Sequence, residues 1–62
     1  MEAELHRAAR RVMGFSGKDR LTVESVKDRR RVLAKKHHPD RGGSVATMAR
    51  INDAADVLLA SL

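Results

Sequence analysis

The chain has no cysteine, tyrosine or tryptophan, and only one proline and one phenylalanine. Without cysteine there can be neither a disulfide framework nor a thiolate metal site, so the core must be stabilised by packing alone. The longest uninterrupted apolar run, Val57–Ala60, has four residues, which is too short to cross a bilayer or to form a signal-peptide core. We therefore expect a soluble chain, cytoplasmic by default, with a membrane anchor only if these residues belong to a longer protein.

Sixty-two residues are enough for one small domain, 1–62, and leave no room for a second. Lysine and arginine number 13 against 8 acidic residues, and most of the excess lies in the middle of the chain. Residues 22–43 carry seven basic and three acidic side chains, a balance of +4, whereas residues 44–62 carry one and two, a balance of −1. This distribution predicts an acidic partner. The single aromatic residue rules out a stacking platform for single-stranded nucleic acid.

The tripeptide His38-Pro39-Asp40 follows a basic helical stretch and precedes a glycine pair. Pro39 fixes its own φ and disfavours helical geometry at His38, so a helix running through Lys36 should end there. Gly42-Gly43 permits a sharp reversal, and Ser44 is a suitable N-cap for the next helix. The pattern predicts two helices joined by a stiff loop over residues 37–44.

Helical spacing of apolar residues predicts three helices, at about 2–13, 23–36 and 45–61. Gly14 is a natural end for the first, and Thr22 a natural cap for the second. Phe15 should fold back onto the core. No stretch alternates with period two, so the predicted class is all-α: an antiparallel pair, residues 23–36 and 45–61, with the first helix packed across it.

Each predicted helix has an apolar face. The expected core residues of the first helix are Leu5, Ala8, Ala9, Val12 and Met13; those of the second are Val23, Val26, Leu33, Ala34 and His37; those of the third are Met48, Ile51, Ala55, Leu58, Leu59 and Leu62. Beside the second of these faces, the i, i+4, i+8 spacing of Lys27, Arg31 and Lys35 predicts a basic stripe.

The basic helix, the His38-Pro39-Asp40 tripeptide, the Gly42-Gly43-Ser44 turn and the later Ile51-Asn52-Asp53-Ala54 resemble a J domain, the cochaperone module of DnaJ-like proteins. The resemblance extends from about Arg11 to Leu59. It is greatest to the short J domains of the mitochondrial presequence translocase motor and related bacterial proteins, which also lack the fourth helix of longer J domains.

This resemblance implies a cochaperone that binds a DnaK-type (heat-shock protein 70) chaperone and stimulates its ATP hydrolysis. It implies that Asp40 engages the ATPase domain and linker of the chaperone. It also implies that His38 is an orienting and contact residue and that Pro39 shapes the corner. The implied assisting residues are Lys27, Arg31, Lys35, Arg41 and Met48; for Met48, ordinary core packing is an equal alternative. These charges should act mainly on the rate and orientation of encounter with the partner, so their effect should become weaker as salt is added.

No phosphate-binding glycine loop or catalytic dyad is present, so we expect no enzyme activity and no cofactor, with ATP and magnesium belonging to the partner. Adjacent His37 and His38 with Asp40, and His6 as an extra ligand, suggest a metal site, but two neighbouring histidines at a helix end do not easily face one ion. We expect none. Two other functions stay open: a small basic DNA-binding domain, and an inactive J-like scaffold that pairs with another J protein. Oligomeric state is not indicated.

Three residues depart from the family pattern. Arg30 lies where Tyr or His is usual, Ala55 replaces a larger residue, and Val32 replaces a basic one. We expect the Arg30 stem to lie over Ala55, with its guanidinium reaching solvent or an acidic group such as Asp56. The Val32 difference bears on the strength of partner binding.

Overall fold

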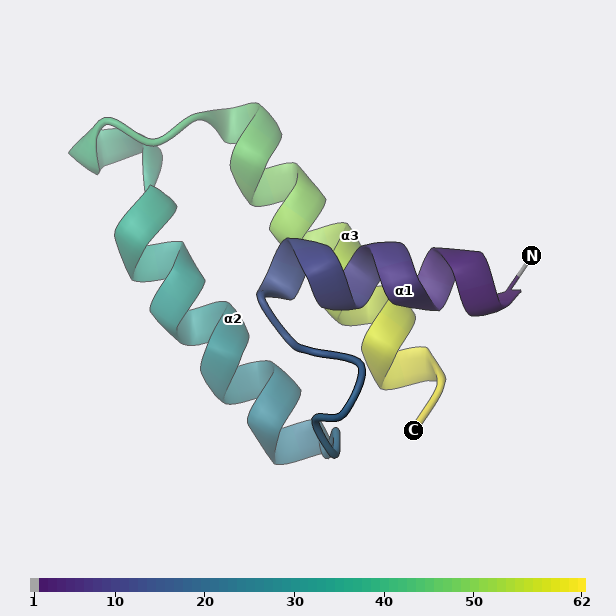
Figure 1. The fold of residues 1–62 in the computed structure, drawn as a ribbon. Helices are drawn as coiled ribbons and strands as arrows, with labels where there is room; N and C mark the ends of the chain where they lie inside the picture. Colours follow the sequence, from purple (N-terminus) through teal and green to yellow (C-terminus); the bar gives the residue numbers. More distant parts are fainter. Residues whose placement is uncertain (1) are drawn as a thin grey trace.

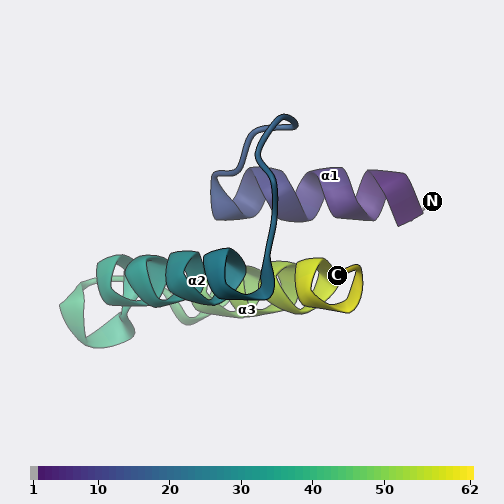
Figure 2. The ribbon, with the colours of Figure 1, turned by 90° about the horizontal axis from the view of Figure 1, so that it is seen from below.

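The computed structural model describes the backbone of residues 2–62 and the side chains of residues 4–62. This part of the chain forms three α-helices, α1 (Glu2–Met13), α2 (Val23–His37) and α3 (Val45–Ala60), and contains no strand. Helices α2 and α3 run antiparallel, and α1 crosses them as a second layer (Figures 1 and 2). The predicted all-α hairpin with a first helix packed across it is confirmed.

The helix bounds differ from the expected ones by no more than one residue. The second helix includes His37, and the third ends at Ala60. The expected loop is not irregular throughout, because Pro39–Arg41 forms one turn of 3₁₀ helix, η1. Over residues 2–62, no helix is long and apolar enough to cross a membrane.

The core lies between α1 and the hairpin, and α1 packs mainly on α3. Its buried side chains are all apolar: Ala9, Met13, Val26, Ile51, Ala54, Ala55 and Leu58. Phe15 packs against this cluster, as expected, and so do Leu21 and Leu33. Because Ala54 and Ala55 are short, the first helix can approach α3 closely.

The apolar faces are narrower than the sequence predicts. On α1 the expected core residues Ala8, Leu5 and Val12 are exposed, the last two at 60% and 38%, and only Ala9 and Met13 are buried. Val23 and Leu62 were also expected in the core and are about half exposed. Leu5 and Val23 lie in the first turn of their helices, and Leu62 lies beyond the end of α3. The core residue that the pattern missed is Ala54.

Polar contacts fix the connector between α1 and α2. The first helix ends at Gly14, which adopts φ 78°, a left-handed conformation that costs glycine little. The Arg29 guanidinium from α2 donates to the carbonyls of Met13 and Gly14 at 3.2 and 3.3 Å. Its central carbon lies 4.6 Å from the centre of the Phe15 ring, a cation–π distance. Arg29 therefore joins the second helix to the end of the first.

Both predicted N-caps are present. The Thr22 hydroxyl accepts from the Ser25 amide at 3.0 Å, and the Ser25 hydroxyl accepts from the Thr22 amide at 2.9 Å, which makes a capping box at the start of α2. The Ser44 hydroxyl accepts from the Thr47 amide at 2.9 Å at the start of α3. These bonds satisfy amides that have no partner inside their helix.

Candidate functional site

The His38-Pro39-Asp40 corner lies at the tip of the hairpin, where α2 ends. His38 has φ −60° and ψ 135°, an extended geometry that the following proline favours. Pro39 then occupies the first position of η1, where its missing N–H removes no hydrogen bond. The His38 ring nitrogen Nδ1 accepts from the Asp40 amide at 3.2 Å and so caps this short turn. The side chain that the family resemblance marks as orienting thus bonds directly to the backbone of Asp40.

Three backbone hydrogen bonds close the corner. The His38 carbonyl accepts from the amides of Arg41 and Gly43, at 2.9 and 3.0 Å, and the Pro39 carbonyl accepts from the Gly42 amide at 3.3 Å. Gly42 has φ 87°, a left-handed conformation. Gly43 passes so close to the end of α2 that a Cβ atom there would lie 1.8 Å from the His37 carbonyl oxygen. The two glycines have different tasks: the first provides the reversal and the second the close approach.

This scaffold holds the Asp40 carboxylate in solvent. The side chain of Asp40 is 90% exposed, and that of His38 is 53% exposed. The Asp40 Oδ2 atom lies 3.7 Å from His38 Nδ1, a contact that becomes an ion pair only when the imidazole is protonated. Among the residues whose side chains are described, no lysine or arginine forms an ion pair with Asp40. A rigid turn therefore presents a carboxylate that is available to a partner.

Basic residues surround this carboxylate. A shallow hollow of about 400 Å³ is lined by Arg31, Ala34, Lys35, His38, Asp40 and Arg41. It brings five of the predicted site residues together at the end of α2 and in the corner. The surface alternates charge over a short distance, with one carboxylate among three permanent cations. It is suited to a partner that offers both acidic and basic groups.

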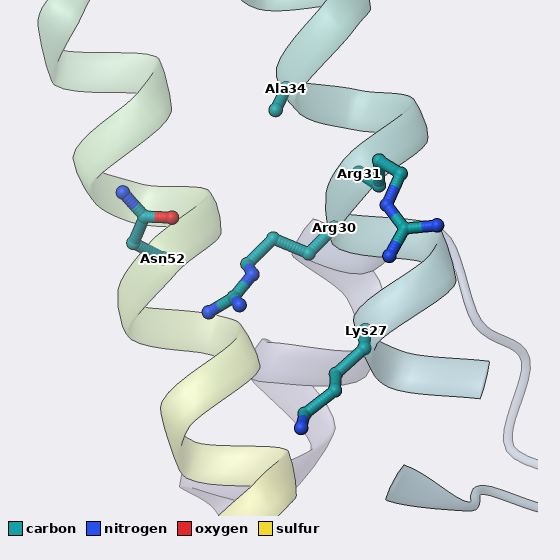
Figure 3. A pocket seen from close by; sticks show the side chains of 5 residues that line it. All are labelled: Lys27, Arg30, Arg31, Ala34 and Asn52. Atoms are coloured by element: carbon teal, nitrogen blue, oxygen red, sulfur yellow. The ribbon is translucent and has the colours of Figure 1, made fainter. Parts of the chain in front are cut away.

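A second hollow of about 330 Å³ continues along the hairpin between α2 and α3. Its lining residues are Lys27, Arg30, Arg31, Ala34 and Asn52 (Figure 3). Arg31 and Ala34 line both hollows. The Arg30 side chain is half-buried and points from α2 towards α3, as the sequence predicts, while among the described side chains no ion pair joins it to Asp56.

The remaining predicted site residues lie around these hollows. Lys27 and Lys35 are exposed on the stripe with Arg31, so the stripe faces solvent as expected. Pro39 is exposed in the corner. Met48 is half-buried and packs against the core, and it is not among the residues that line either hollow. Within residues 4–62, no group of three or more histidine, aspartate or glutamate side chains is placed to hold a metal ion.

The sequence predicted that the Arg30 stem lies over Ala55, and it marked Asn52 only as part of the Ile51-Asn52-Asp53-Ala54 motif. The structure places both in the wall of one hollow. Neither position carries a sequence signal for this, because the meeting of an arginine on one helix with an asparagine 22 positions later depends on how the hairpin is packed. The basic stripe indicated part of this hollow, because two of its residues, Lys27 and Arg31, line the hollow beside Arg30.

Sequence comparison gives an independent view of the chain. No protein-family model matches it, and no solved structure matches it significantly. Among curated proteins it is 44% identical over 41 residues to the mitochondrial import inner membrane translocase subunit TIM14 of Dictyostelium discoideum. The aligned residues are 66% of this chain and 36% of that protein, so the chain spans about a third of its relative. This identity, with the helical hairpin and the His38-Pro39-Asp40 corner at its tip, supports the resemblance of the chain to a J domain.

Proposed function

We propose that the chain is a J-domain cochaperone, which binds a DnaK-type chaperone and stimulates ATP hydrolysis by that chaperone. The observation that carries the proposal is the Asp40 carboxylate, 90% exposed and mounted on a hydrogen-bonded turn. A carboxylate that only braced its own loop would be expected to bond to neighbouring amides or cations. Here the bracing comes from the His38 ring and from backbone carbonyls instead.

The basic residues supply approach and orientation in this proposal. Lys27, Arg31, Lys35 and Arg41 are all exposed and lie along one side of α2 and its end. Exposed charges of this kind raise the rate of encounter with an acidic surface and fix the angle of docking, and they contribute less to the lifetime of the complex. Binding should therefore be much weaker in high salt, while the effect of Asp40 on hydrolysis should persist at saturation.

The chain carries out no chemistry itself in this proposal. The partner binds ATP and magnesium, and the cochaperone acts by selecting the conformation of the partner that hydrolyses ATP. Such an effect requires that the J domain bind this conformation more tightly than the others. Asp40 and His38 are the residues that would make this distinction, and the basic stripe would bind the alternatives almost equally.

A single-turnover measurement tests the proposal. ATP hydrolysis by a DnaK-type chaperone is followed without cochaperone, with the parent chain, and with Asp40→Asn. Asp53→Asn, an exposed aspartate on α3, is the matched control because it makes the same chemical change elsewhere. We expect stimulation by the parent and by Asp53→Asn, and none by Asp40→Asn, with circular dichroism showing that all three are helical. Full stimulation by Asp40→Asn would refute the assigned mechanism.

A further inference from the structure

One atom, Nδ1 of the His38 ring, faces two groups of Asp40. It accepts from the Asp40 backbone amide at 3.2 Å, and it lies 3.7 Å from the Oδ2 atom of the Asp40 carboxylate. An imidazole nitrogen that accepts a hydrogen bond carries no proton, so in this geometry the ring is neutral, with its proton on Nε2. The neutral ring offers the carboxylate no donor from Nδ1, and the side chain of Asp40 is 90% exposed.

A proton on Nδ1 reverses both contacts of the ring. In the protonated imidazole both nitrogens are donors, so Nδ1 can no longer accept from the Asp40 amide and the cap of η1 is lost. The same N–H can instead donate to Oδ2, which has to move only a short way from 3.7 Å to form a charge-assisted hydrogen bond. The carboxylate is then bound within its own loop.

The surroundings of His38 allow this exchange without unfolding. The His38 side chain is 53% exposed, so solvent protons reach the ring in the folded chain. The charged groups that line the same hollow are Arg31 and Lys35 of α2 and Asp40 and Arg41 of η1, and α3 contributes none. The cations act against a charge on the ring, and the carboxylate acts for it. Among the described side chains, Asp40 is the acidic group that lies within ion-pair distance of His38.

We propose that His38 is a proton switch that decides whether the Asp40 carboxylate is available to the partner. The neutral ring caps the Asp40 amide and leaves the carboxylate in solvent, whereas the protonated ring releases the amide and binds the carboxylate. Histidine changes its charge between about pH 5 and pH 8, so stimulation should decrease in mild acid. This consequence rests on the proposed function, but the switch itself is a property of this chain alone.

The size of the effect follows from the fraction of chains whose ring is neutral. Only these chains present the carboxylate, so the apparent affinity for the partner falls in proportion to their fraction. When about two thirds of the rings are protonated, the cochaperone concentration that gives half-maximal stimulation should rise about threefold. The maximal rate should change less, because a high concentration of cochaperone still supplies the neutral form.

Nuclear magnetic resonance of the isolated chain tests the switch without a partner. The signals of the His38 ring, the Asp40 amide and the Asp40 carboxyl carbon are followed from about pH 8 to about pH 5.5, where aspartates in general stay ionised. We expect an unprotonated Nδ1 at pH 8, and Asp40 signals that move with the same midpoint as the His38 ring. His37→Gln, which removes the neighbouring histidine of α2, should leave this coupling unchanged, and His38→Gln should abolish it. Asp40 signals that do not follow the His38 ring would overturn the proposal.

Single-turnover hydrolysis tests the consequence for stimulation. The half-maximal cochaperone concentration is measured across the same pH range, relative to the rate of the chaperone alone at each pH, with the parent and with His37→Gln. Both should show a rise of about threefold or more, with the midpoint that the His38 ring shows in the isolated chain. An unchanged concentration, or a rise with a different midpoint, would refute the control of stimulation by His38, and the cochaperone function would stand. A parent chain that stimulates at no pH would remove the proposed function and the control of stimulation together, whereas coupled Asp40 and His38 signals would still establish the switch.

Discussion

Replacing Arg29 by alanine removes the contact that fastens α2 to the end of α1. One guanidinium nitrogen, Nη1, donates to the carbonyls of both Met13 and Gly14, and the guanidinium lies over the Phe15 ring. Hydrogen bonds with a charged partner contribute about 1.5–3 kcal/mol each when well formed. Since these two share one nitrogen and are 3.2 and 3.3 Å long, we count them together as about 1.5 kcal/mol.

The ring contact adds about 0.5 to 1 kcal/mol at a partly exposed site. The total of about 2 kcal/mol is large for this chain, because a domain of 62 residues has a free energy of unfolding of roughly 3 to 9 kcal/mol. For a domain of this size it corresponds to a fall in Tm of about 8–16 °C. The loss should fall mainly on the packing of α1 and less on the α2–α3 hairpin.

Thermal and urea unfolding followed by circular dichroism measure this effect. The matched control is Arg31→Ala, two residues along the same helix, whose one ion pair among the described residues is exposed and 3.8 Å long; it should cost under about 0.5 kcal/mol. When Phe15 is also replaced by leucine, Arg29→Ala should lower the free energy of unfolding by less, because the contact between the guanidinium and the ring is already absent. Surface substitutions usually change the free energy of unfolding by no more than about 0.5 kcal/mol. If the free energies of unfolding of Arg29→Ala and Arg31→Ala differ by less than about this amount, Arg29 does not fasten α2 to α1.

Two further substitutions probe the corner. Gly43→Ala places a methyl group 1.8 Å from the His37 carbonyl oxygen, so the backbone must shift and the free energy of unfolding should fall by about 2 kcal/mol. Gly17→Ala is the control, because a Cβ atom there would have nothing within 4 Å. Equal melting temperatures of the two variants would contradict the close approach at Gly43. Ser44→Ala removes the cap of α3 and should lower the free energy of unfolding by about 1 kcal/mol, whereas Ser44→Gly should lower it by only a few tenths. Chemical unfolding distinguishes the two variants. An unchanged free energy of unfolding for Ser44→Ala would mean that the cap is not formed in solution.

Local signals predicted the helices and their ends well. Thr22, Ser44 and Gly14 each act through their own backbone or the next turn, so their roles could be read from the sequence without knowledge of the packing. The same holds for His38, whose extended geometry follows from the proline after it. The 3₁₀ turn at Pro39–Arg41 was not predicted, because it depends on the His38 carbonyl accepting two amides at once.

Features that need two distant segments were missed. The contact of Arg29 with Phe15 depends on the path of the connector over residues 14–22. Leu5 fits an apolar face by spacing and is nevertheless 60% exposed, because the crossing angle of α1 decides how much of its face is covered. The hollow that Arg30 and Asn52 line depends on how α2 and α3 pack against each other. The Asp40 corner was predictable because its residues are contiguous, and this hollow was not.

The most direct test of the central claim measures the single-turnover rate of ATP hydrolysis by a DnaK-type chaperone at saturating cochaperone. The quantity compared is the ratio of the rate with the parent chain to the rate with Asp40→Asn. The account predicts that the parent accelerates hydrolysis and that Asp40→Asn leaves the rate at the level of the chaperone alone, although both chains melt at nearly the same temperature because the carboxylate is exposed. Equal acceleration by the two chains would contradict the account, since it would show that the carboxylate held out by the corner has no part in stimulation.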